Sequence, residues 1–190
     1  MQTQTDLDLV KKVQSGSLQA FKQLIENHKN HVFHLCLKIL KNQEESEEVA
    51  QDVFIKIYKA LKKFRGDSKF STWLYRITYN ECLVRLRKNR KRLLQTELDE
   101  EVLDLEFIEQ KFQQVEIDER NRIIDRSLNV LDEINRTIIL LYYYHENSVE
   151  EISKIVGLSE TNIKTRLFRA RKQLLSYFEK KLKIANKEMI

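Results

Sequence analysis

The sequence predicts an all-α fold in which two small helical domains are joined by an acidic linker. The chain has 190 residues, no proline and only three glycines, and 33% of its residues are charged. Proline and glycine are the residues that most often interrupt helices, so their scarcity favours a nearly all-helical protein. The length is sufficient for one or two small domains that each bury a core.

Charge is distributed unevenly along the chain. The formal net charge is +5, yet residues 93–122 contain ten acidic and three basic side chains, which is a net charge of −7. The rest of the chain therefore carries +12. Two basic lobes on either side of an acidic connector favour a polyanionic partner such as nucleic acid.

Composition also disfavours several classes of protein. Cys36 and Cys82 are far apart and neither belongs to a C-x-x-C pair, which argues against a zinc site or disulfides and suits a cytoplasmic protein. Three glycines leave no glycine-rich phosphate loop. Residues 1–10 are polar and acidic, unlike a signal peptide, and the longest apolar run, near residues 31–40, is too short for membrane insertion. We therefore expect no cofactor, no metal and no membrane insertion.

Apolar periodicity and capping residues predict the helices in order. Asp6 and Ser17 can each cap a helix, and Lys41-Asn42 breaks the apolar stripe that follows Ser17. In the first domain we expect helices at about residues 6–14, 17–40, 44–64 and 71–92, with a polar loop at 65–70. In the second domain we expect amphipathic helices at 117–131 and 135–146, followed by the segment described next.

The segment Ser148–Lys172 predicts a helix-turn-helix. Gly157 can adopt the positive φ that a tight turn between two helices needs, with the small Ser153 four residues before it and Ile163 six residues after it. In the second helix, an apolar stripe is expected to pack on the core, and a basic, hydroxyl-bearing face is expected to contact DNA in the major groove.

A second basic segment suits single-stranded DNA. Phe64–Asn80 is a polar loop bracketed by aromatics, and it leads into a helix whose end, Arg85–Arg92, has six bases in eight residues. Clustered cations can neutralise phosphates, and aromatics beside polar loop residues suit an unstacked base. Taken alone, Phe70 and Trp73 are more typical of core aromatics.

With these segments in order, the sequence resembles bacterial sigma-70 factors of the short extracytoplasmic-function (ECF, group 4) type. Ser46–Leu61 is similar to region 2.2, Phe64–Arg92 to regions 2.3–2.4, and Ser148–Lys172 to region 4.2. The resemblance covers roughly residues 7–178. It implies region 2 in residues 1–92, a linker in 93–122, region 4 in 123–182 and a basic tail in 183–190.

The resemblance also implies roles for individual residues. The helix that binds the β′ clamp of core RNA polymerase is matched by Glu48, Gln51, Asp52 and Ile55. Capture of a flipped −10 base and contacts to the −10 element are matched by Arg65, Gly66, Asp67, Ser68, Phe70, Arg76, Asn80, Arg85, Arg87, Lys88 and Lys91. Recognition of the −35 element is matched by Lys164, Thr165, Arg166, Phe168, Arg169 and Arg171.

The implied function is that of a sigma factor, a DNA-binding subunit without catalytic residues of its own. It would bind core RNA polymerase through the β′ clamp and β flap, direct initiation at promoters with −35 and −10 elements, and stabilise the melted −10 strand. An anti-sigma factor is a further expected partner. The acidic linker resembles the segment that occupies the RNA exit path of the polymerase.

Two departures from the family pattern and two alternatives remain. Family members often have Gly-Thr-Val where this chain has Thr161-Asn162-Ile163, and many have a proline where Leu131-Asp132-Glu133 stands.

One alternative is an ordinary helix-turn-helix regulator, which would leave the first domain unexplained. The other is a helical metalloenzyme, but His28 and His34 project from different sides of a helix and no Glu-x-x-His pair occurs.

Overall fold

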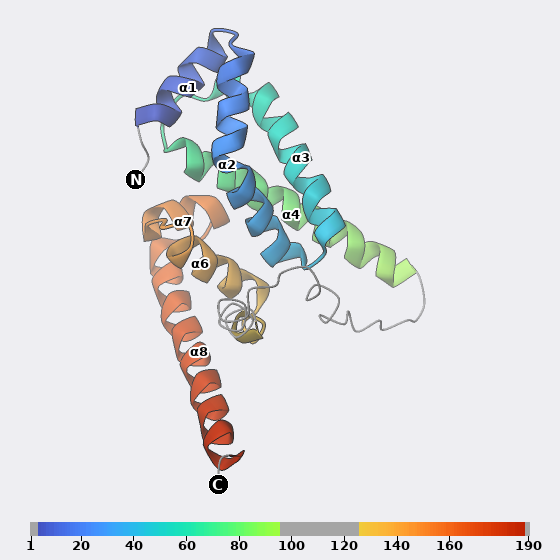
Figure 1. The fold of residues 1–190 in the computed structure, drawn as a ribbon, viewed down its shortest axis with the longest axis vertical. Coiled ribbons are helices and arrows are strands. Elements are labelled where there is room, and N and C mark those ends of the chain that lie inside the picture. The colour runs from blue at the N-terminus through green and yellow to red at the C-terminus, as the bar shows by residue number, and fades with distance from the viewer. Residues whose placement is uncertain (1–3, 96–125, 189–190) are drawn as a thin grey trace.

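A computed structural model describes the backbone of residues 4–95 and 126–188 and the side chains of residues 6–90 and 126–179. The described residues form helices and no strands, which confirms the all-α prediction. The linker, including all of residues 96–125, lies outside the described residues. Helices α1 to α4 form one body, α6 and α7 pack beside it, and α8 extends away from both (Figure 1).

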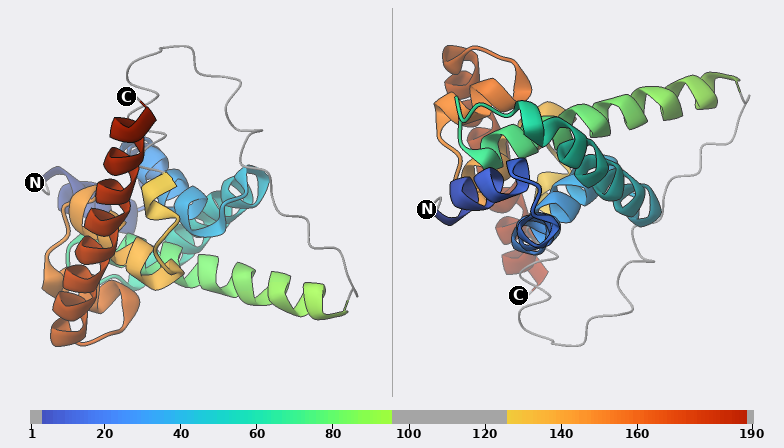
Figure 2. Two further views of the ribbon diagram at one scale, coloured as in Figure 1. Left: turned by 90° about the horizontal axis from the view of Figure 1, so that it is seen from below. Right: turned by 90° about the horizontal axis from the view of Figure 1, so that it is seen from above.

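The first body contains the four predicted helices. They are α1 (Gln4–Gln14), α2 (Leu18–Leu40), α3 (Gln43–Ala60) and α4 (Phe70–Gln95), and a short 3₁₀ helix (Leu61–Lys63) follows α3. Helix α2 packs against α1, α3 and α4 and is therefore the central helix of this body. The far end of α4 projects beyond the helices that cover its first half (Figure 2).

Local sequence explains where α2 and α3 begin and end. The side chain of Ser17 accepts a hydrogen bond from the backbone N–H of Ala20, and that of Asn42 accepts one from Glu45. Such caps satisfy backbone donors that have no partner within the helix. Lys41 adopts a left-handed conformation with φ of 56°, which ends α2 immediately before the new cap.

Three details differ from the sequence-based expectations. Asp6 does not cap α1 but lies within it, where its buried carboxylate is 2.9 Å from Nε2 of His28. The third helix changes to 3₁₀ geometry at Leu61, because the chain must turn there into the loop that precedes α4. Helix α4 begins at Phe70 rather than at residue 71. A long-range partner for Asp6 could not be read from local capping rules.

The second body contains a helical turn at residues 126–128, then α6 (Glu133–Tyr143), α7 (Val149–Val156) and α8 (Glu160–Glu188). Asp132 caps α6, so this helix begins two residues before the predicted position. The part of the predicted helix at 117–125 lies outside the described residues. Helix α8 continues through residue 183, where a tail was expected to begin.

The helix-turn-helix has the predicted local geometry. Ser148 and Glu151 form a capping box in which each side chain bonds the other residue's backbone N–H. Gly157 ends α7 with φ of 74°, a conformation that costs little without a side chain. The hydroxyl of Ser153 donates to the carbonyl of Leu158 across the turn, so this small residue also ties the two helices together.

Arg136 joins α6 to the segment before it. Its side chain is buried, with Nε 3.0 Å from the carbonyl oxygen of Leu128 and Nη2 2.9 Å from that of Leu131. Burial lowers the pKa of the guanidinium, although Glu133 and Asp132 nearby oppose this shift. The group stays charged because an arginine pKa is far above neutral pH. The guanidinium therefore satisfies two carbonyls at the end of the short helical turn.

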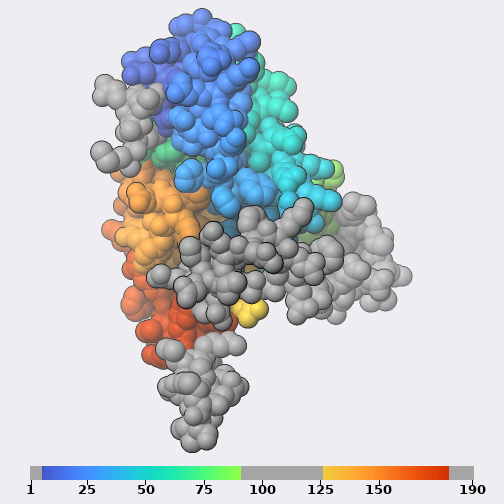
Figure 3. Space-filling view, viewed as in Figure 1, coloured from blue at the N-terminus to red at the C-terminus, as the bar shows by residue number. Residues whose placement is uncertain are grey.

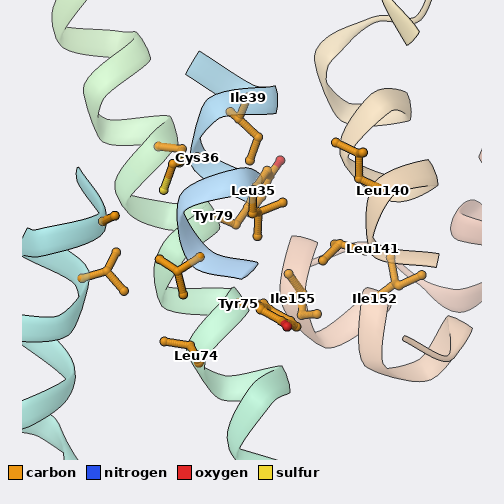
Figure 4. Close-up of a cluster of buried hydrophobic side chains, with 14 of the residues drawn as sticks. Leu35, Cys36, Ile39, Leu74, Tyr75, Tyr79, Leu140, Leu141, Ile152 and Ile155 are labelled. Atoms are coloured by element: carbon orange, nitrogen blue, oxygen red, sulfur yellow. The ribbon is translucent and has the colours of Figure 1, made fainter. Parts of the chain in front are cut away.

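The two bodies share one continuous apolar core. Helix α7 packs against α4, and α6 packs against α2. Tyr75 of α4 lies beside Ile155 of α7, and both are at most 5% exposed (Figure 4). In the space-filling view, the surface of α6 and α7 adjoins that of the first body (Figure 3).

Replacing Arg136 with methionine should lower the free energy of unfolding by about 2 kcal/mol, because two buried carbonyls lose charge-assisted hydrogen bonds while the side-chain volume is largely kept. Urea unfolding followed by circular dichroism measures this loss. The control is Lys22→Met at an exposed position of α2, for which we expect a change below about 0.5 kcal/mol. Equal stability of the two variants would show that the hydrogen bonds from Arg136 to the two carbonyls do not stabilise the fold.

Candidate nucleic-acid interface

The second helix of the helix-turn-helix has one buried and one exposed face, as predicted. Ile163, Leu167 and Ala170 are at most 3% exposed and pack on the core. On the other side, Phe168 is 67% exposed, although it is a large apolar residue. Of the six residues predicted to read the −35 element, Arg166 is half-buried and the other five are exposed: Lys164, Thr165, Phe168, Arg169 and Arg171.

Arg166 and Arg171 are held by neighbouring side chains. Arg166 donates through Nε to Asn162 at 2.9 Å and through Nη1 to Asn135 of α6 at 3.1 Å. Asn162, which differs from the common family pattern, therefore orients Arg166. Arg171 donates to the Tyr143 hydroxyl at 2.8 Å, and its guanidinium also lies 5.6 Å from that ring. Both arginines are thus positioned before any ligand binds.

The loop before α4 is exposed and stands on an aromatic cluster. Gly66 has φ of 81°, which permits the sharp turn, and Arg65 and Asp67 form an exposed ion pair of 3.1 Å. Phe70 is 1% exposed, and its ring packs against those of Phe64 and Trp73, which also contact each other. Phe70 is therefore a packing residue that supports the loop, and it presents no surface to a base in this state. Ser68 is half-buried at the end of the loop.

Cations and one amide follow the outer side of α4. Arg76, Asn80 and Arg87 are exposed at intervals of four and seven residues, and Lys88 is exposed beside them. The side chain of Lys91 lies outside the described residues, although its backbone is part of α4.

Arg85 is already paired with an acid of α3. Its guanidinium donates to Glu48 at 2.8 Å, which raises the pKa of Arg85 despite partial burial. Glu48 was predicted to contact polymerase and Arg85 to contact DNA. The structure therefore links these two predicted surfaces through one ion pair.

The outer face of α3 is exposed as the sequence indicated. Glu48, Gln51, Asp52 and Ile55 are all exposed, and Ile55 is 54% exposed although it is aliphatic. Tyr58, one turn further on, is 46% exposed and was missed. Its spacing of three residues from Ile55 is the signal that could have found it. Together Ile55 and Tyr58 form an apolar surface on an otherwise charged helix.

A contact between the two bodies was also missed. Oε1 of Glu151 is 2.9 Å from Nζ of Lys69 and accepts a hydrogen bond of 3.3 Å from the hydroxyl of Thr72. Its other oxygen accepts the backbone N–H of Ser148 at 2.8 Å. Burial alone would raise the pKa of Glu151, but these donors outweigh burial and lower it. Lys69 belongs to the predicted base-capture loop, so an acid of α7 occupies part of that site.

His145 lies between the bodies, in the turn before α7. Its ring packs against Tyr75 of α4 and His31 of α2, at centroid distances of 4.7 and 5.5 Å. Its Nδ1 is buried and has no hydrogen-bond partner among the described residues. Burial, and then the nearby His31 and His34, lower the pKa of His145 to about 4. This imidazole is therefore neutral at physiological pH.

The described residues offer little for other chemistry. Within residues 4–95 and 126–188, no three His, Cys, Asp or Glu side chains are grouped as metal ligands. None of the helices in these ranges has both the length and the apolar character of a membrane span. Cys36 and Cys82 are buried, and a hydrogen bond with Cys36, together with burial, raises the pKa of Cys82. A thiol held protonated in this way is a poor nucleophile.

Comparison with known families finds both regions that the sequence suggested. Residues 24–92 match the family Sigma-70 region 2, and residues 121–174 match Sigma-70, region 4. Among curated proteins, the chain is similar to the ECF RNA polymerase sigma factor SigW of Bacillus subtilis. The identity is 32% over 87% of this chain and 92% of that protein. It is also 32% identical to the ECF RNA polymerase sigma-E factor of Escherichia coli K12, over 90% of this chain and 92% of the relative.

Two solved structures share the fold. CnrH, solved in complex with the cytosolic domain of CnrY, aligns with a TM-score of 0.69 at 24% identity, over 92% of this chain and 97% of that one. The sigma factor RpoE of Bartonella quintana, solved with the anti-sigma factor NepR, aligns with a TM-score of 0.71 at 21% identity. That alignment covers 85% of this chain and 98% of RpoE.

Acidification should lower the free energy of unfolding, because His145 is neutral in the folded chain. In the unfolded chain the pKa of His145 returns to about 6.5. As pH falls, His145 therefore takes up a proton in the unfolded state before it does so in the folded state. The stabilising contribution is fully present above pH 6.5 and is lost as pH falls from 6.5 toward about 4. The ionisable groups near the ring are His34, which lies nearby on α2, and those that line the same pocket: Asp6, His28, His31, Lys69, Tyr75, Tyr144 and Glu146. Denaturant midpoints at pH 7.5 and pH 5 measure the loss.

His145→Gln should show a smaller loss between these two pH values than the wild-type chain, because glutamine does not titrate. His34→Gln is the comparison variant, since it removes only the last of the three causes that lower the pKa of His145 and should leave most of the pH dependence in place. An unchanged pH dependence in His145→Gln would show that other groups cause the effect.

Proposed function

The chain belongs to the sigma-70 family of RNA polymerase factors, in its ECF type, and we propose that its exposed surfaces divide promoter recognition and polymerase binding among α3, α4 and α8. A factor of this family directs promoter-specific transcription initiation. We assign region 2 to residues 1–92, the linker to 93–122, region 4 to 123–182 and a basic tail to 183–190. The protein acts by binding and has no chemistry of its own, because the polymerase forms the RNA bonds.

One observation carries this proposal. The chain presents a basic, amide-bearing stripe on α4 and a basic face with an exposed aromatic on α8, each backed by a packed core. Both surfaces have the chemistry that phosphate and base contacts require. An ordinary helix-turn-helix regulator would account for α8 alone and would leave the stripe on α4 without a purpose.

The face of α8 reads the −35 element. Arg169 and Lys164 are free to reach phosphates or guanine edges, and Thr165 and Phe168 can contact thymine methyl groups. Arg166 is already held by Asn162 and Asn135. It therefore loses little conformational entropy when it contacts DNA. Arg171, held by Tyr143, serves the edge of this surface.

The loop and stripe of α4 capture the melted −10 strand. Arg65, Gly66, Asp67 and Ser68 form the rim on which a flipped base would bind, with Phe70 packed beneath them. Asn80 offers a donor and an acceptor to a base edge, and Arg76, Arg87, Lys88 and Lys91 follow the phosphates. Melting is favoured because an open strand gains contacts that the duplex cannot make.

The exposed face of α3 binds the β′ clamp of core RNA polymerase. Ile55 supplies exposed apolar area, and Tyr58 extends it. Glu48, Gln51 and Asp52 surround this area with polar groups, as the rim of an interface typically does. Region 4 contacts the β flap in the same complex, while the acidic linker follows a basic path through the enzyme.

A second partner is an anti-sigma factor. RpoE, which shares this fold, was solved with the anti-sigma factor NepR, and CnrH, which also shares it, was solved with the cytosolic domain of CnrY. We propose that a protein of this kind holds the present chain inactive until it is released, and that both act in the cytoplasm, where the polymerase is found.

The direct test is transcription in vitro. Purified chain added to core RNA polymerase of its own source should produce initiation at discrete promoters in genomic DNA, and core enzyme alone should not. If the chain instead binds duplex DNA tightly by itself and leaves the core enzyme inactive, it is a regulator of the ordinary helix-turn-helix kind.

Asn80→Ala should reduce open-complex formation about tenfold while leaving core binding unchanged, since the amide contacts a base only after melting. Permanganate reactivity of thymines measures opening, and co-migration with core enzyme measures binding. The matched control is Lys62→Ala, an exposed residue of the 3₁₀ helix outside the stripe. A parallel loss of opening and core binding would place Asn80 at the polymerase instead.

Arg169→Ala should weaken transcription that depends on the −35 element and should reduce the salt slope of promoter binding by about one ion, since one phosphate contact is lost. Binding titrations at several salt concentrations measure the slope. Lys29→Ala on α2, exposed and distant from the recognition face in sequence and element, is the control. An unchanged slope in Arg169→Ala would remove this residue from the interface.

A further inference from the structure

We propose that a polar cradle holds the guanidinium of Arg166 toward one guanine of the −35 element and thereby sets the base preference of this chain. The cradle consists of Asp132 and Asn135 at the start of α6 and of Asn162 in the first turn of α8. This inference rests on the proposed function, because it takes the face of α8 as the −35 reader. It adds residues that act on a DNA contact through Arg166, and it names the base that is read.

The cradle begins at the cap of α6. Oδ1 of Asp132 accepts the backbone N–H of Asn135 at 2.7 Å, and Oδ2 accepts its side-chain amide at 2.9 Å. A carboxylate only accepts hydrogen bonds, so the NH2 group of Asn135 must face Asp132 and its amide oxygen must face the other way. That oxygen accepts from Nη1 of Arg166 at 3.1 Å. Asp132 therefore fixes the orientation of the amide that binds Arg166.

Asn162 completes the cradle from α8 itself. It precedes Arg166 by four residues, so the two side chains are neighbours on one side of the helix. Its Oδ1 accepts from Nε of Arg166 at 2.9 Å. Helix α6 packs against α8 (Figure 1), so the guanidinium is held from two helices. Both contacts come from neutral amides, which direct the guanidinium without cancelling its charge.

The two departures from the family pattern meet at this arginine. Asp132 lies in the stretch where many family members have a proline, whose side chain has no acceptor. Asn162 lies where the common pattern has a threonine, whose hydroxyl is on a shorter side chain. A relative with proline and threonine there would lack the acceptors at both ends of the cradle. The cradle thus gives this chain a way to differ from its relatives at the −35 element.

The remaining donors of Arg166 suit a guanine. A guanidinium has five N–H groups, of which the cradle uses one on Nε and one on Nη1. The others are on the two terminal nitrogens. A guanine edge offers two neighbouring acceptors, O6 and N7, which two such donors can bind together. Arg166 is half-buried in the second turn of α8, and the first turns of a recognition helix are the part that reaches base edges.

A fixed guanidinium suits a base better than a phosphate. Phosphate contacts carry no sequence information, and a mobile cation serves them equally well. Discrimination among bases requires donors of fixed direction, because a misaligned donor loses most of its hydrogen bond. Asn135 is buried and Asp132 is an acid, so both are positioning residues that act through Arg166 rather than DNA contacts.

Asp132→Asn weakens the cradle without removing the helix cap. Asparagine caps a helix as well as aspartate does, but it offers one acceptor oxygen instead of two. Glu133→Gln is the matched control, because it removes the same charge from the neighbouring exposed position of α6 and does not touch the cradle. Asn135→Ala removes the amide, and Arg166→Ala removes the reader.

Selection from a promoter library measures the base preference. Each variant is assembled with core RNA polymerase and mixed with duplexes of one promoter, found in the initiation test, in which the −35 element is randomised. Sequencing of bound and unbound duplexes gives the relative affinity for each base at each position. Circular dichroism verifies that each variant is folded at the assay temperature, and Asp132→Asn alone decides if Asn135→Ala does not fold.

The wild-type chain should prefer guanine at one position by about tenfold, as a contact with two hydrogen bonds does. Arg166→Ala should lose this preference. Asp132→Asn and Asn135→Ala should reduce it to about threefold or less at the same position, because a guanidinium without the cradle still binds but with less direction. Glu133→Gln should keep it. In the Arg166→Ala background, Asn135→Ala should change the preference no further, since the amide acts only through Arg166.

Each other outcome rejects a different statement. Uniform weakening at all positions in Arg166→Ala, with a smaller salt slope, would assign this arginine to a phosphate and overturn the inference. Full guanine preference in both Asp132→Asn and Asn135→Ala, or an equal loss in Glu133→Gln, would overturn the cradle. A wild-type chain that shows no preference at any −35 position with core polymerase would instead contradict the proposed function.

Discussion

The apolar contact between α4 and α7 is the interaction on which the arrangement of this molecule depends. Each domain has helices enough to fold around its own core, yet the buried side chains of the two domains form a single cluster. Tyr75 and Ile155 lie in that cluster, where water is excluded. Because burial of apolar surface is favourable, the two domains adhere in the absence of a partner.

Some cations of this chain are exposed, and others are paired with acids of the same chain. Arg76 and Arg87 of α4 and Lys164 of α8 are exposed, whereas Lys69 is engaged by Glu151. Arg85 is likewise engaged by Glu48 on the neighbouring helix. A protein that must bind a polyanion thus carries some of its own acids beside its cations. On the proposed assignment, binding of DNA or polymerase would exchange these internal ion pairs for external ones, which would favour partners that supply several contacts together.

Most elements could be predicted because their causes are local. The caps at Ser17, Asn42 and Ser148 and the positive φ of Gly157 depend on residues within one helical turn. The core face of α8 follows from the 3.6-residue period. The errors arose where a distant residue decided the outcome. Asp6 pairs with His28, 22 residues away, rather than capping α1.

The sequence by itself determined the all-α fold, the helix-turn-helix and the basic stripes, because periodicity, capping and charge are written in residues close along the chain. It also carried the family resemblance that the comparisons bear out. Only the tertiary structure decided that Glu151 meets Lys69, that His145 lies neutral between the two domains, and that Asn135 of α6 holds Arg166. The first two depend on which surfaces meet after both domains have folded. Such contacts join residues many positions apart, and no local pattern encodes them.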